Sequence, residues 1–427
     1  MTTLIIVIMF LVLAICGMRV AFALGFSTLI GLMFLTGFNP HMVAQRIVTG
    51  IDSYSLLAIP LFMLAGKLMN EGGITQRIFD LCRVFVGQIR GSLAYVNVLA
   101  SIAFATMSGS AVADVGGLGQ VEIKAMKDEG YPEEFAAAIT LASSAVGPII
   151  PPSINFVIYS VLANVSTGAL FLAGIIPGLL MGVSLLVLVF IMGFYIKYPV
   201  TKERFTVKEA LVVVKKALLP LLAPVIILGG IMGGIFTPTE ASSVAAVYAL
   251  ILGLFVYKNI KVKDIPNIFL DVIVATAMVT FIIGCSSSFS WIMVVDNVAN
   301  LLLETVTAIT QNKILILLGL NIIMLVLGCF MENSTLLILL APIFLPMAIQ
   351  LGVDPVQFGV VMVLNLMIGV VTPPVGTALF VVSNMTGLTI GKLMKPVFTF
   401  VVPLIVVLIL VTYIPEISLT LPRLLMG

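Results

Sequence analysis

One stretch of this sequence, from Phe135 to Ile196, contains no charged residue and yet contains Pro148, Pro151, Pro152 and Pro177. Such an apolar run suits the hydrocarbon core of a bilayer, which one helix crosses with about 20 residues. Proline lacks a backbone donor and interrupts helices. The stretch therefore predicts membrane-buried backbone that contains breaks in its helices.

Composition extends this prediction to the whole chain. Of 427 residues, 61% are hydrophobic and 9% are charged, against about 25% charged in a soluble domain. The net charge of +2 is too small for a nucleic-acid partner, whose phosphates call for clustered Lys and Arg. The cysteines are scattered singly, which predicts neither a disulfide nor a metal framework. The expected surroundings are a lipid bilayer.

Apolar stretches of suitable length predict an all-α, polytopic membrane protein. The N-terminal stretch lacks the features of a cleaved secretory signal, so we expect it to remain as the first membrane segment. The candidate segments lie near residues 3–17, 19–36, 54–70, 92–107, 135–150, 168–196, 218–235, 241–257, 266–290, 314–331, 356–371 and 396–414.

Two basic segments predict the orientation of the chain. Lys197 to Lys216 is the most basic part of the sequence, and Lys258 to Lys263 is the second. The apolar residues between them suffice for one helical hairpin, so both basic segments lie on one side, which the positive-inside rule makes cytoplasmic. At the tip of that hairpin, Thr237 to Glu240 has the pattern of a helix capping box, which explains Glu240 better than a proton-carrying role. We expect a multi-pass protein of the bacterial inner membrane.

An internal repeat is visible in the sequence. Gly130 to Phe135 is followed by Gly147 to Pro152, and in the second half Gly352 to Phe358 is followed by Gly369 to Pro374. The spacing from Gly130 to Gly147 is 17 residues, as is the spacing from Gly352 to Gly369. Transporters are often built from inverted repeats of this kind.

A short polar patch precedes each repeated block, Ser108 to Ser110 in the first half and Glu332 to Thr335 in the second. Each half therefore predicts a re-entrant helical hairpin with a polar tip, a short loop, and a helix broken at a double proline. We expect two inverted repeats in the manner of ion-coupled transporters.

The double prolines predict free main-chain oxygens. Pro151 and Pro152 cannot donate to the carbonyls of Gly147 and Pro148, and the second pair likewise releases Gly369 and Val370. Unpaired carbonyls at membrane depth are costly unless something satisfies them, and a hard cation does so with oxygen ligands. The candidate hydroxyl and amide ligands are Ser108 and Ser110 near Gly147, and Asn333, Ser334 or Thr335 with Thr372 near Gly369.

Sodium suits these sites better than a transition metal, because His, Cys and paired carboxylates are absent from them. The alternative is structural: a double proline can be a kink, and Ser-Gly-Ser can be a close-packing face between helices. For either half alone the two interpretations are even, whereas the matched pair favours two ion sites.

Glu332 is the lone charge between Lys313 and Asp354. An ionisable residue at membrane depth is functional by default, so we assign Glu332 to the substrate or ion cavity. The alternative is a residue at the membrane rim whose carboxylate reaches water.

At five places the sequence resembles the large, DctM-type membrane subunit of tripartite ATP-independent periplasmic (TRAP) transporters. These are residues 52–60, 108–114, 147–153, 234–241 and 372–376, in family order along nearly the whole chain. The resemblance implies an elevator mechanism, in which a mobile transport domain moves against a fixed scaffold. It also implies two partners, a small four-helix membrane subunit of the DctQ type and a periplasmic substrate-binding protein.

The resemblance further implies which residues form the sites. Sodium would bind at Ser108, Ser110, Gly147, Ile150 and Pro152, and in the second half around Gly369 and Thr372, near Asn333. Substrate would lie between the hairpin tips, near Ser110, Ser153 or Asn155, and Glu332. Many relatives have Asp where this chain has Glu332.

We predict five segments. They are N-terminal scaffold helices (1–90), the first repeat with its hairpin (91–196), a basic loop with scaffold helices (197–313), the second repeat with its hairpin (314–390), and a C-terminal helix (391–427). The predicted function is sodium-coupled import of an organic anion, such as a C4-dicarboxylate or a sugar acid like sialic acid. An anion channel and a proton-coupled transporter of the same architecture remain alternatives.

Enzymes and ATP-driven pumps are disfavoured. The sole histidine, His41, has no partner for nucleophilic catalysis, and the zinc-protease and phosphate-loop motifs do not occur in the sequence.

Overall fold

The computed structural model describes residues 2–33, 39, 41–87, 89–195, 198–199, 206–374 and 376–426. Part of the basic segment predicted at 197–216, including Lys197, Lys202 and Arg204, lies outside these ranges, as does Val375 next to the second double proline. Within the described ranges the chain is helical and contains no strand. The all-α prediction is confirmed.

Two series of helices follow the same order. The first series comprises α6 (Ser92–Ser108), α7 (Ala111–Asp128), α8 (Glu133–Ser144), α9 (Ile154–Ala163) and α10 (Thr167–Met192). The second comprises α15 (Lys313–Gly328), α16 (Asn333–Gln350), α17 (Pro355–Val371), α18 (Thr377–Thr386) and α19 (Ile390–Tyr413), and α20 (Pro415–Met426) follows it. In each series a hairpin is followed by a helix in two pieces and then by a long helix.

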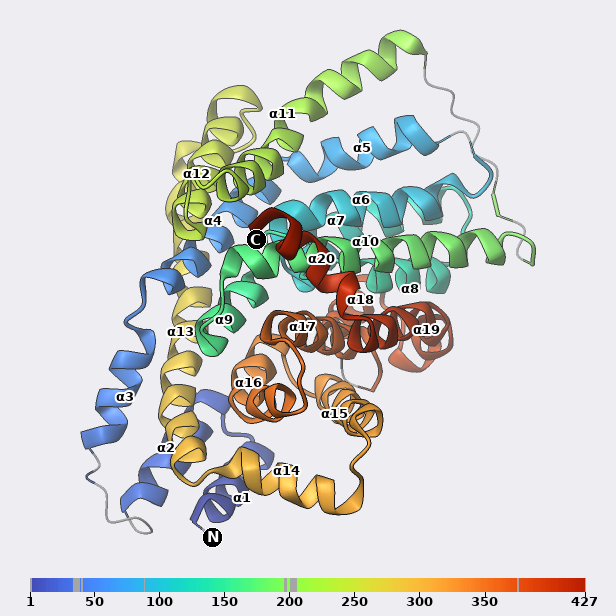
Figure 1. Ribbon diagram of the computed structural model, residues 1–427. Coiled ribbons are helices and arrows are strands. Elements are labelled where there is room, and N and C mark those ends of the chain that lie inside the picture. Colours follow the sequence, from blue (N-terminus) through green and yellow to red (C-terminus); the bar gives the residue numbers. More distant parts are fainter. Residues whose placement is uncertain are drawn as a thin grey trace.

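The two series pack against each other reciprocally. Helix α7 contacts α18 while α16 contacts α9, and α8 contacts α19 while α10 contacts α17. Figure 1 shows the first series, in cyan and green, stacked against the second, in orange and red. The repeat that the sequence predicts is therefore also a repeat of packing.

The remaining helices lie beside this stack and beyond both of its ends (Figure 1). They are α1 (Thr2–Ile15), α2 (Val20–Gly31), α3 (His41–Ile51), η2 (Tyr54–Leu57), α4 (Ala58–Glu71), α5 (Ile74–Val86), α11 (Val207–Met232), α12 (Pro238–Ile251), η3 (Leu252–Val256), η4 (Val262–Asp264), α13 (Ile265–Val295) and α14 (Val298–Ile309). The longest, α13, runs upright beside the stack in Figure 1 and packs against α2, α3, α4 and α16.

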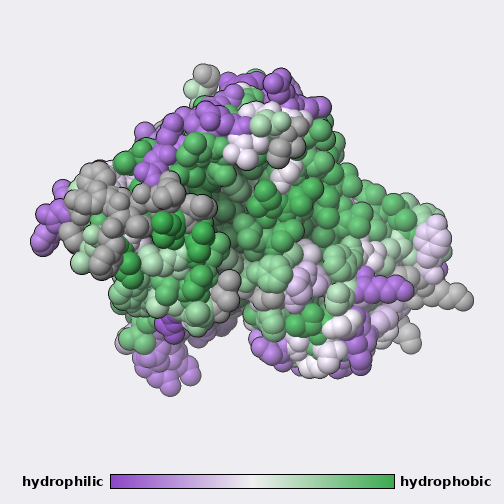
Figure 2. Space-filling model, turned by 90° about the horizontal axis from the view of Figure 1, so that it is seen from below, coloured by the Kyte–Doolittle hydropathy of each residue, from purple (hydrophilic) through white to green (hydrophobic). Residues whose placement is uncertain are grey.

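Six of the described helices are long and apolar enough to cross a membrane, and up to eight spans result if each of two bent pairs counts as one. Hydrophobic side chains cover a broad region of the face shown in Figure 2, and hydrophilic ones gather at its edges. In water this surface would be unfavourable, whereas in lipid it is solvated. The capping box at Thr237 and Glu240 is present at the start of α12, as predicted.

The candidate membrane segments omit eight of the described helices, which are α3, α5, α7, α9, α14, α16, α18 and α20. Helix α5 carries Arg77, Asp80 and Arg83, and α7 carries Glu122 and Lys124, so neither is an uninterrupted apolar run. Helix α16 is apolar but contains two prolines, which packed membrane helices tolerate because neighbours satisfy the freed groups.

Candidate ion and substrate site

Both double prolines interrupt their helices. Helix α8 ends at Ser144 and α9 begins at Ile154, while α17 ends at Val371 and α18 begins at Thr377. The Pro151–Pro152 and Pro373–Pro374 peptide bonds are both cis. The prediction of a helix broken at each double proline is confirmed.

Each hairpin tip is docked on the break of its own half. Gly109, at the tip between α6 and α7, has φ 57°, and a Cβ there would lie 2.7 Å from the carbonyl oxygen of Pro152. In the second half a Cβ on Gly369 would lie 2.6 Å from the Cα of Gly328. Only glycine permits these approaches, because any side chain would overlap the facing backbone.

The first break leaves the main-chain oxygen of Gly147 without a donor among the described residues. The hydroxyl of Ser153 donates to the carbonyl of Pro148 and accepts the N–H of Phe156 at 3.3 Å. Within the described part of the chain, no hydrogen bond reaches the carbonyl of Gly147. Its backbone adjoins that of Ser110, the first residue of the hairpin's second limb.

The second break differs from the prediction. The carbonyl of Gly369 is not left free, because it accepts the N–H of Thr372 at 3.0 Å. The loss of the bond to Pro373 is made up by a tighter turn, a common way to satisfy carbonyls at a helix end. The hydroxyl of Thr372 donates to the carbonyl of Ile368. No described donor reaches the carbonyl of Val370, so that part of the prediction holds.

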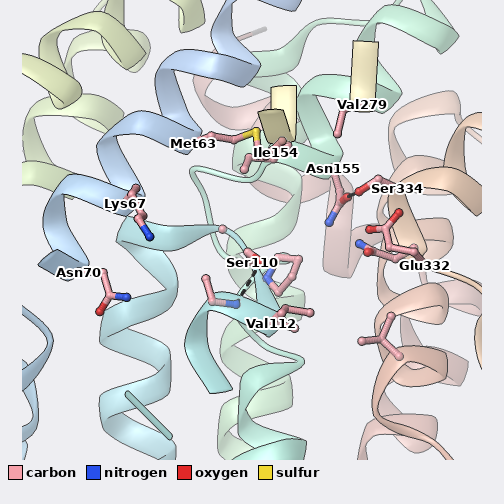
Figure 3. Close-up of a pocket in the computed structure, with 18 of the residues that line it drawn as sticks. Met63, Lys67, Asn70, Ser110, Val112, Ile154, Asn155, Val279, Glu332 and Ser334 are labelled. Carbon is pink, nitrogen blue, oxygen red and sulfur yellow. Dashed lines mark hydrogen bonds between the residues drawn. The ribbon is translucent and has the colours of Figure 1, made fainter. Parts of the chain in front are cut away.

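A cavity of about 430 Å³ lies between the two tips. Its walls come from both hairpin tips, from the start of α9, and from α4 and α13 (Figure 3). Five residues predicted from the sequence line it: Ser110, Asn155, Glu332, Asn333 and Ser334.

The other predicted residues lie behind the cavity wall. Ser153 is fully buried, and its hydroxyl is engaged by the main chain. The residues of the breaks that are proposed to hold ions also do not line the cavity; they are Gly147, Ile150, Pro152, Gly369 and Thr372. The backbone of Ser108 ends α6, while its side chain lies outside the described part of the structure. The breaks therefore reach the cavity wall only at Pro148 and Val370, and these predicted ligands lie next to it.

The tips are capped and joined across the cavity. Ser110 caps α7 by accepting the N–H of Ala113 at 3.3 Å, and Glu332 caps α16 by accepting the N–H of Thr335 at 2.9 Å. The hydroxyl of Ser334 donates to Oδ1 of Asn155 at 3.3 Å, which links the second tip to the first repeat. Glu332 thus combines the capping of a helix with a position in the cavity wall.

Three helices begin at the cavity. The cavity is lined by residues from the first turns of α7, α9 and α16, among them Ala111, Ile154 and Asn333. Helix N-termini carry partial positive charge and free N–H groups, which favour anions. At α16 the Glu332 carboxylate offsets this charge.

Sequence reasoning missed a charged pair in the opposite wall. Lys67 of α4 and Asp271 of α13 both line the cavity, and Nζ of Lys67 lies 3.0 Å from Oδ2 of Asp271. Each is the single charge within its predicted apolar segment, 54–70 and 266–290. A lone charge in a membrane segment is a functional signal by default, so the sequence did contain the clue.

In each half, a buried asparagine in the first helix of the hairpin forms a hydrogen bond with the helix that precedes the double proline. In the first half, Asn97 of α6 donates to Glu122 at 2.9 Å and to Thr140 at 2.6 Å, and it accepts from Ser143 at 2.9 Å. All four side chains are buried. Buried polar networks of this kind are stable when their members are paired.

In the second half, Asn321 of α15 takes the place of Asn97. Asn365 donates to its Oδ1 at 2.9 Å, and Asn321 donates to Thr412 at 3.0 Å. Asn365 precedes Gly369 by the same interval at which Ser143 precedes Gly147. The sequence comparison of the halves did not include this feature.

Comparison with known proteins assigns the family. The profile of the family described as "Tripartite ATP-independent periplasmic transporter, DctM component" matches residues 7–417. The chain belongs to this family. It is therefore a transporter subunit rather than an enzyme, a multi-pass protein of the bacterial inner membrane that takes part in TRAP import with a small membrane subunit and a periplasmic binding protein.

Two curated relatives carry different substrate names. The chain is 44% identical to "Sialic acid TRAP transporter large permease protein SiaM" of Vibrio cholerae, over 96% of each chain. It is 40% identical to "C4-dicarboxylate TRAP transporter large permease protein DctM" of Pseudomonas aeruginosa, over 94% of each chain.

Among solved structures, the chain resembles the YdaH transporter of Alcanivorax borkumensis. The TM-score is 0.65 at 15% identity, over 92% of this chain and 90% of that one. The MtrF efflux pump of Neisseria gonorrhoeae gives a TM-score of 0.61 at 12% identity, over 87% and 83%. These likenesses support the polytopic membrane fold.

Proposed function

We propose that this TRAP subunit couples the import of an organic anion to sodium. The observation that carries the proposal is the convergence of two broken helices and two docked hairpin tips, one set from each half, on a single cavity. Paired breaks of this kind supply main-chain oxygens for ions and helix N-termini for an anion.

Two sodium ions are proposed, one at each break. The first site uses Ser108, Ser110, Gly147, Ile150 and Pro152, and the second uses Asn333, Gly369 and Thr372. Oxygen ligands without imidazole or thiolate suit a hard cation. The free carbonyl of Gly147 and the neighbouring Ser110 support the first site, and the Thr372 hydroxyl, with oxygen lone pairs to spare, supports the second.

The substrate is proposed to be a carboxylate that binds between the tips, near Ser110, Asn155 and Glu332. The starts of α7 and α9 at the cavity support an anionic ligand. The names of the relatives suggest a sugar acid such as sialic acid, or a C4-dicarboxylate. A periplasmic binding protein would deliver it, with a small four-helix subunit of the DctQ type beside the scaffold.

We further propose an elevator movement. The reciprocal packing of the two series supports a unit made of 91–196 and 314–390 that moves as one body, against a scaffold made of 1–90 and 197–313. The described part of the C-terminal segment 391–427 contains α20 and all but the first residue of α19, and both helices pack on α10 and α17, with α19 also on α8. In this proposal it therefore moves with the repeats.

Reconstitution tests the proposal. The subunit is purified with its small membrane partner and placed in liposomes, and uptake of labelled N-acetylneuraminate or succinate is measured with the binding protein outside. We expect uptake only with an inward sodium gradient. Uptake that is unchanged when potassium replaces sodium would refute sodium coupling, and uptake driven by a proton gradient alone would favour the proton-coupled alternative.

A further inference from the structure

Lys67 is the only Lys or Arg that lines the cavity among the residues that the structure describes. It lies on α4, facing the hairpin tips, with Ser110 and Asn70 near it in Figure 3. Its Nζ lies 3.0 Å from Oδ2 of Asp271 and 3.4 Å from Oε1 of Glu71. Its charge is therefore already partnered within the protein.

The charge of the cavity is unfavourable for an anion while this pairing lasts. Asp271 and Glu332 both line the cavity, against the single positive charge of Lys67. A carboxylate that enters meets two carboxylates and one engaged ammonium. Removing a ligand carboxylate from water requires a compensating partner, and the Lys67 ammonium is the one cationic side chain on the described walls.

The side chains of the Lys67–Asp271 ion pair are exposed enough for Lys67 to exchange Asp271 for another carboxylate. The side chain of Lys67 is 35% exposed, that of Asp271 61% and that of Glu71 49%. Exposed pairs contribute little to stability, because water solvates both partners when they separate. Asp271 can return to water at little cost, while a substrate carboxylate at Lys67 gains a charged hydrogen bond.

The same pair borders a second pocket. A cavity of about 210 Å³ is lined by Lys67, Glu71 and Asp271 together with Asn259, Asp264 and Asn267. Its far wall belongs to the loop that contains Lys258 to Lys263, which the sequence places on the cytoplasmic side. Lys67 and Asp271 therefore stand on the shared wall of the central cavity and a polar pocket on that side.

We propose that Lys67 binds the carboxylate of the substrate by exchanging it for Asp271, at the point where the substrate passes from the central cavity towards the cytoplasmic pocket. This inference rests on the proposed import of an organic anion. Asp271 acts as a competitor for the ammonium, and it holds Lys67 in place when no substrate is bound.

Two neutralising substitutions have opposite expected effects. The probe is N-acetylneuraminate or succinate, whichever the wild-type complex takes up in liposomes. Lys67→Met should raise the half-saturating concentration by about 10-fold to 100-fold, which corresponds to the loss of one charged hydrogen bond. Asp271→Asn should lower it by about two- to fivefold, because the competing partner is removed. Lys67→Arg keeps a cation and should stay within about threefold of wild type.

A matched control is the surface pair of Lys127 and Glu133, with 2.9 Å between Nζ and Oε1. Lys127→Met should leave the half-saturating concentration unchanged. If Asp271→Asn lowers the affinity for the substrate as Lys67→Met does, the ion pair only supports the structure and the proposal is overturned. A folded Lys67→Met variant with wild-type affinity would also overturn it. If Lys67→Met does not assemble, the Asp271→Asn variant decides: a lower half-saturating concentration supports the proposal, and a higher one overturns it.

Failure of the proposed sodium coupling is distinguishable from failure of this inference. Wild-type uptake that proceeds equally in potassium would refute the coupling, and the comparison of half-saturating concentrations among the variants would still be valid. Wild-type complex that takes up neither probe would count against both.

Discussion

Both halves of the molecule interrupt a helix at the same double proline, but the residues around the two interruptions differ in burial and in hydrogen bonding. In the first half, residues 145–153 are all buried, and the tip beside them carries the uncharged Ser110. In the second half, helix α17 continues to Val371, Pro374 is exposed, and the tip carries Glu332.

The main-chain oxygens differ accordingly. The carbonyl of Gly147 accepts no hydrogen bond from the described residues, whereas that of Gly369 is bonded to Thr372. The first break therefore presents a buried carbonyl oxygen, that of Gly147, which a cation can bind. At the second break the carbonyl oxygen of Gly369 already accepts a hydrogen bond at the end of α17. We infer that the first half determines sodium affinity more strongly, while the second, with a charge in the cavity wall, is closer to the substrate.

We expect the largest difference in stability between the halves when the glycine before each double proline is replaced by alanine. In Gly369→Ala the new Cβ would lie 2.6 Å from the backbone of Gly328, whereas in Gly147→Ala the nearest atom is the carbonyl oxygen of Ser144 at 3.2 Å. Backbone cannot move aside as a side chain can, so we expect Gly369→Ala to cost about 1–3 kcal/mol or to prevent assembly. Thermal unfolding of the purified variants measures this, and equal shifts for both would contradict the described contact.

The buried asparagines allow a second comparison. Asn97→Ala removes three side-chain partners, including the carboxyl group of Glu122, which is buried and has one oxygen already unpaired. Asn321→Ala removes two side-chain partners, Thr412 and Asn365. Unpaired buried groups cost about 1–3 kcal/mol each, so the first variant should be the less stable. A larger loss for Asn321→Ala, by thermal unfolding, would show that Glu122 finds another partner.

Sodium dependence should respond more strongly in the first half. We expect Ser110→Ala to raise the sodium concentration for half-maximal uptake about tenfold, as for one lost ligand, and Thr372→Ala to raise it about threefold. Ser110→Gly is the control for helix capping, because glycine caps nearly as well as serine but has no hydroxyl. It should show the same sodium shift as Ser110→Ala. If both hydroxyl variants keep the wild-type sodium response with normal expression, the ions bind elsewhere.

The smallest effect on stability is expected when the second tip is made like the first. Glu332→Ser keeps a good cap on α16, so stability should change by less than about 0.5 kcal/mol, against about 1 kcal/mol for Glu332→Ala. Any change in uptake by the serine variant then reports the lost carboxylate. Wild-type uptake by that variant would assign Glu332 to capping alone, and Glu332→Asp provides the variant that keeps both cap and charge.

The parts of the site that local chemistry determines could be predicted from the sequence. A double proline interrupts a helix wherever it stands, so both breaks lie where the sequence indicates. Ser110 and Glu332 fall at the tips because polar residues in an apolar context mark a turn. The repeat follows from spacing alone.

What the sequence did not reveal depends on contacts between distant segments. Lys67 and Asp271 pair only because α4 packs against α13. The carbonyl of Gly369 is satisfied by a turn that depends on how α17 ends. The burial of Ser153 behind the cavity wall depends on the docking of the first tip. None of these can be read from residue type or spacing.

The central claim is that each proline-broken helix holds a sodium ion, and direct binding tests it. Radioactive sodium is titrated onto the purified wild-type subunit with its small partner, with potassium in excess. We predict saturable binding of about two ions per chain, with the affinity of one site lowered about tenfold by Ser110→Ala and that of the other about threefold by Thr372→Ala. Binding that does not saturate, or that potassium displaces as well as sodium does, would contradict the account.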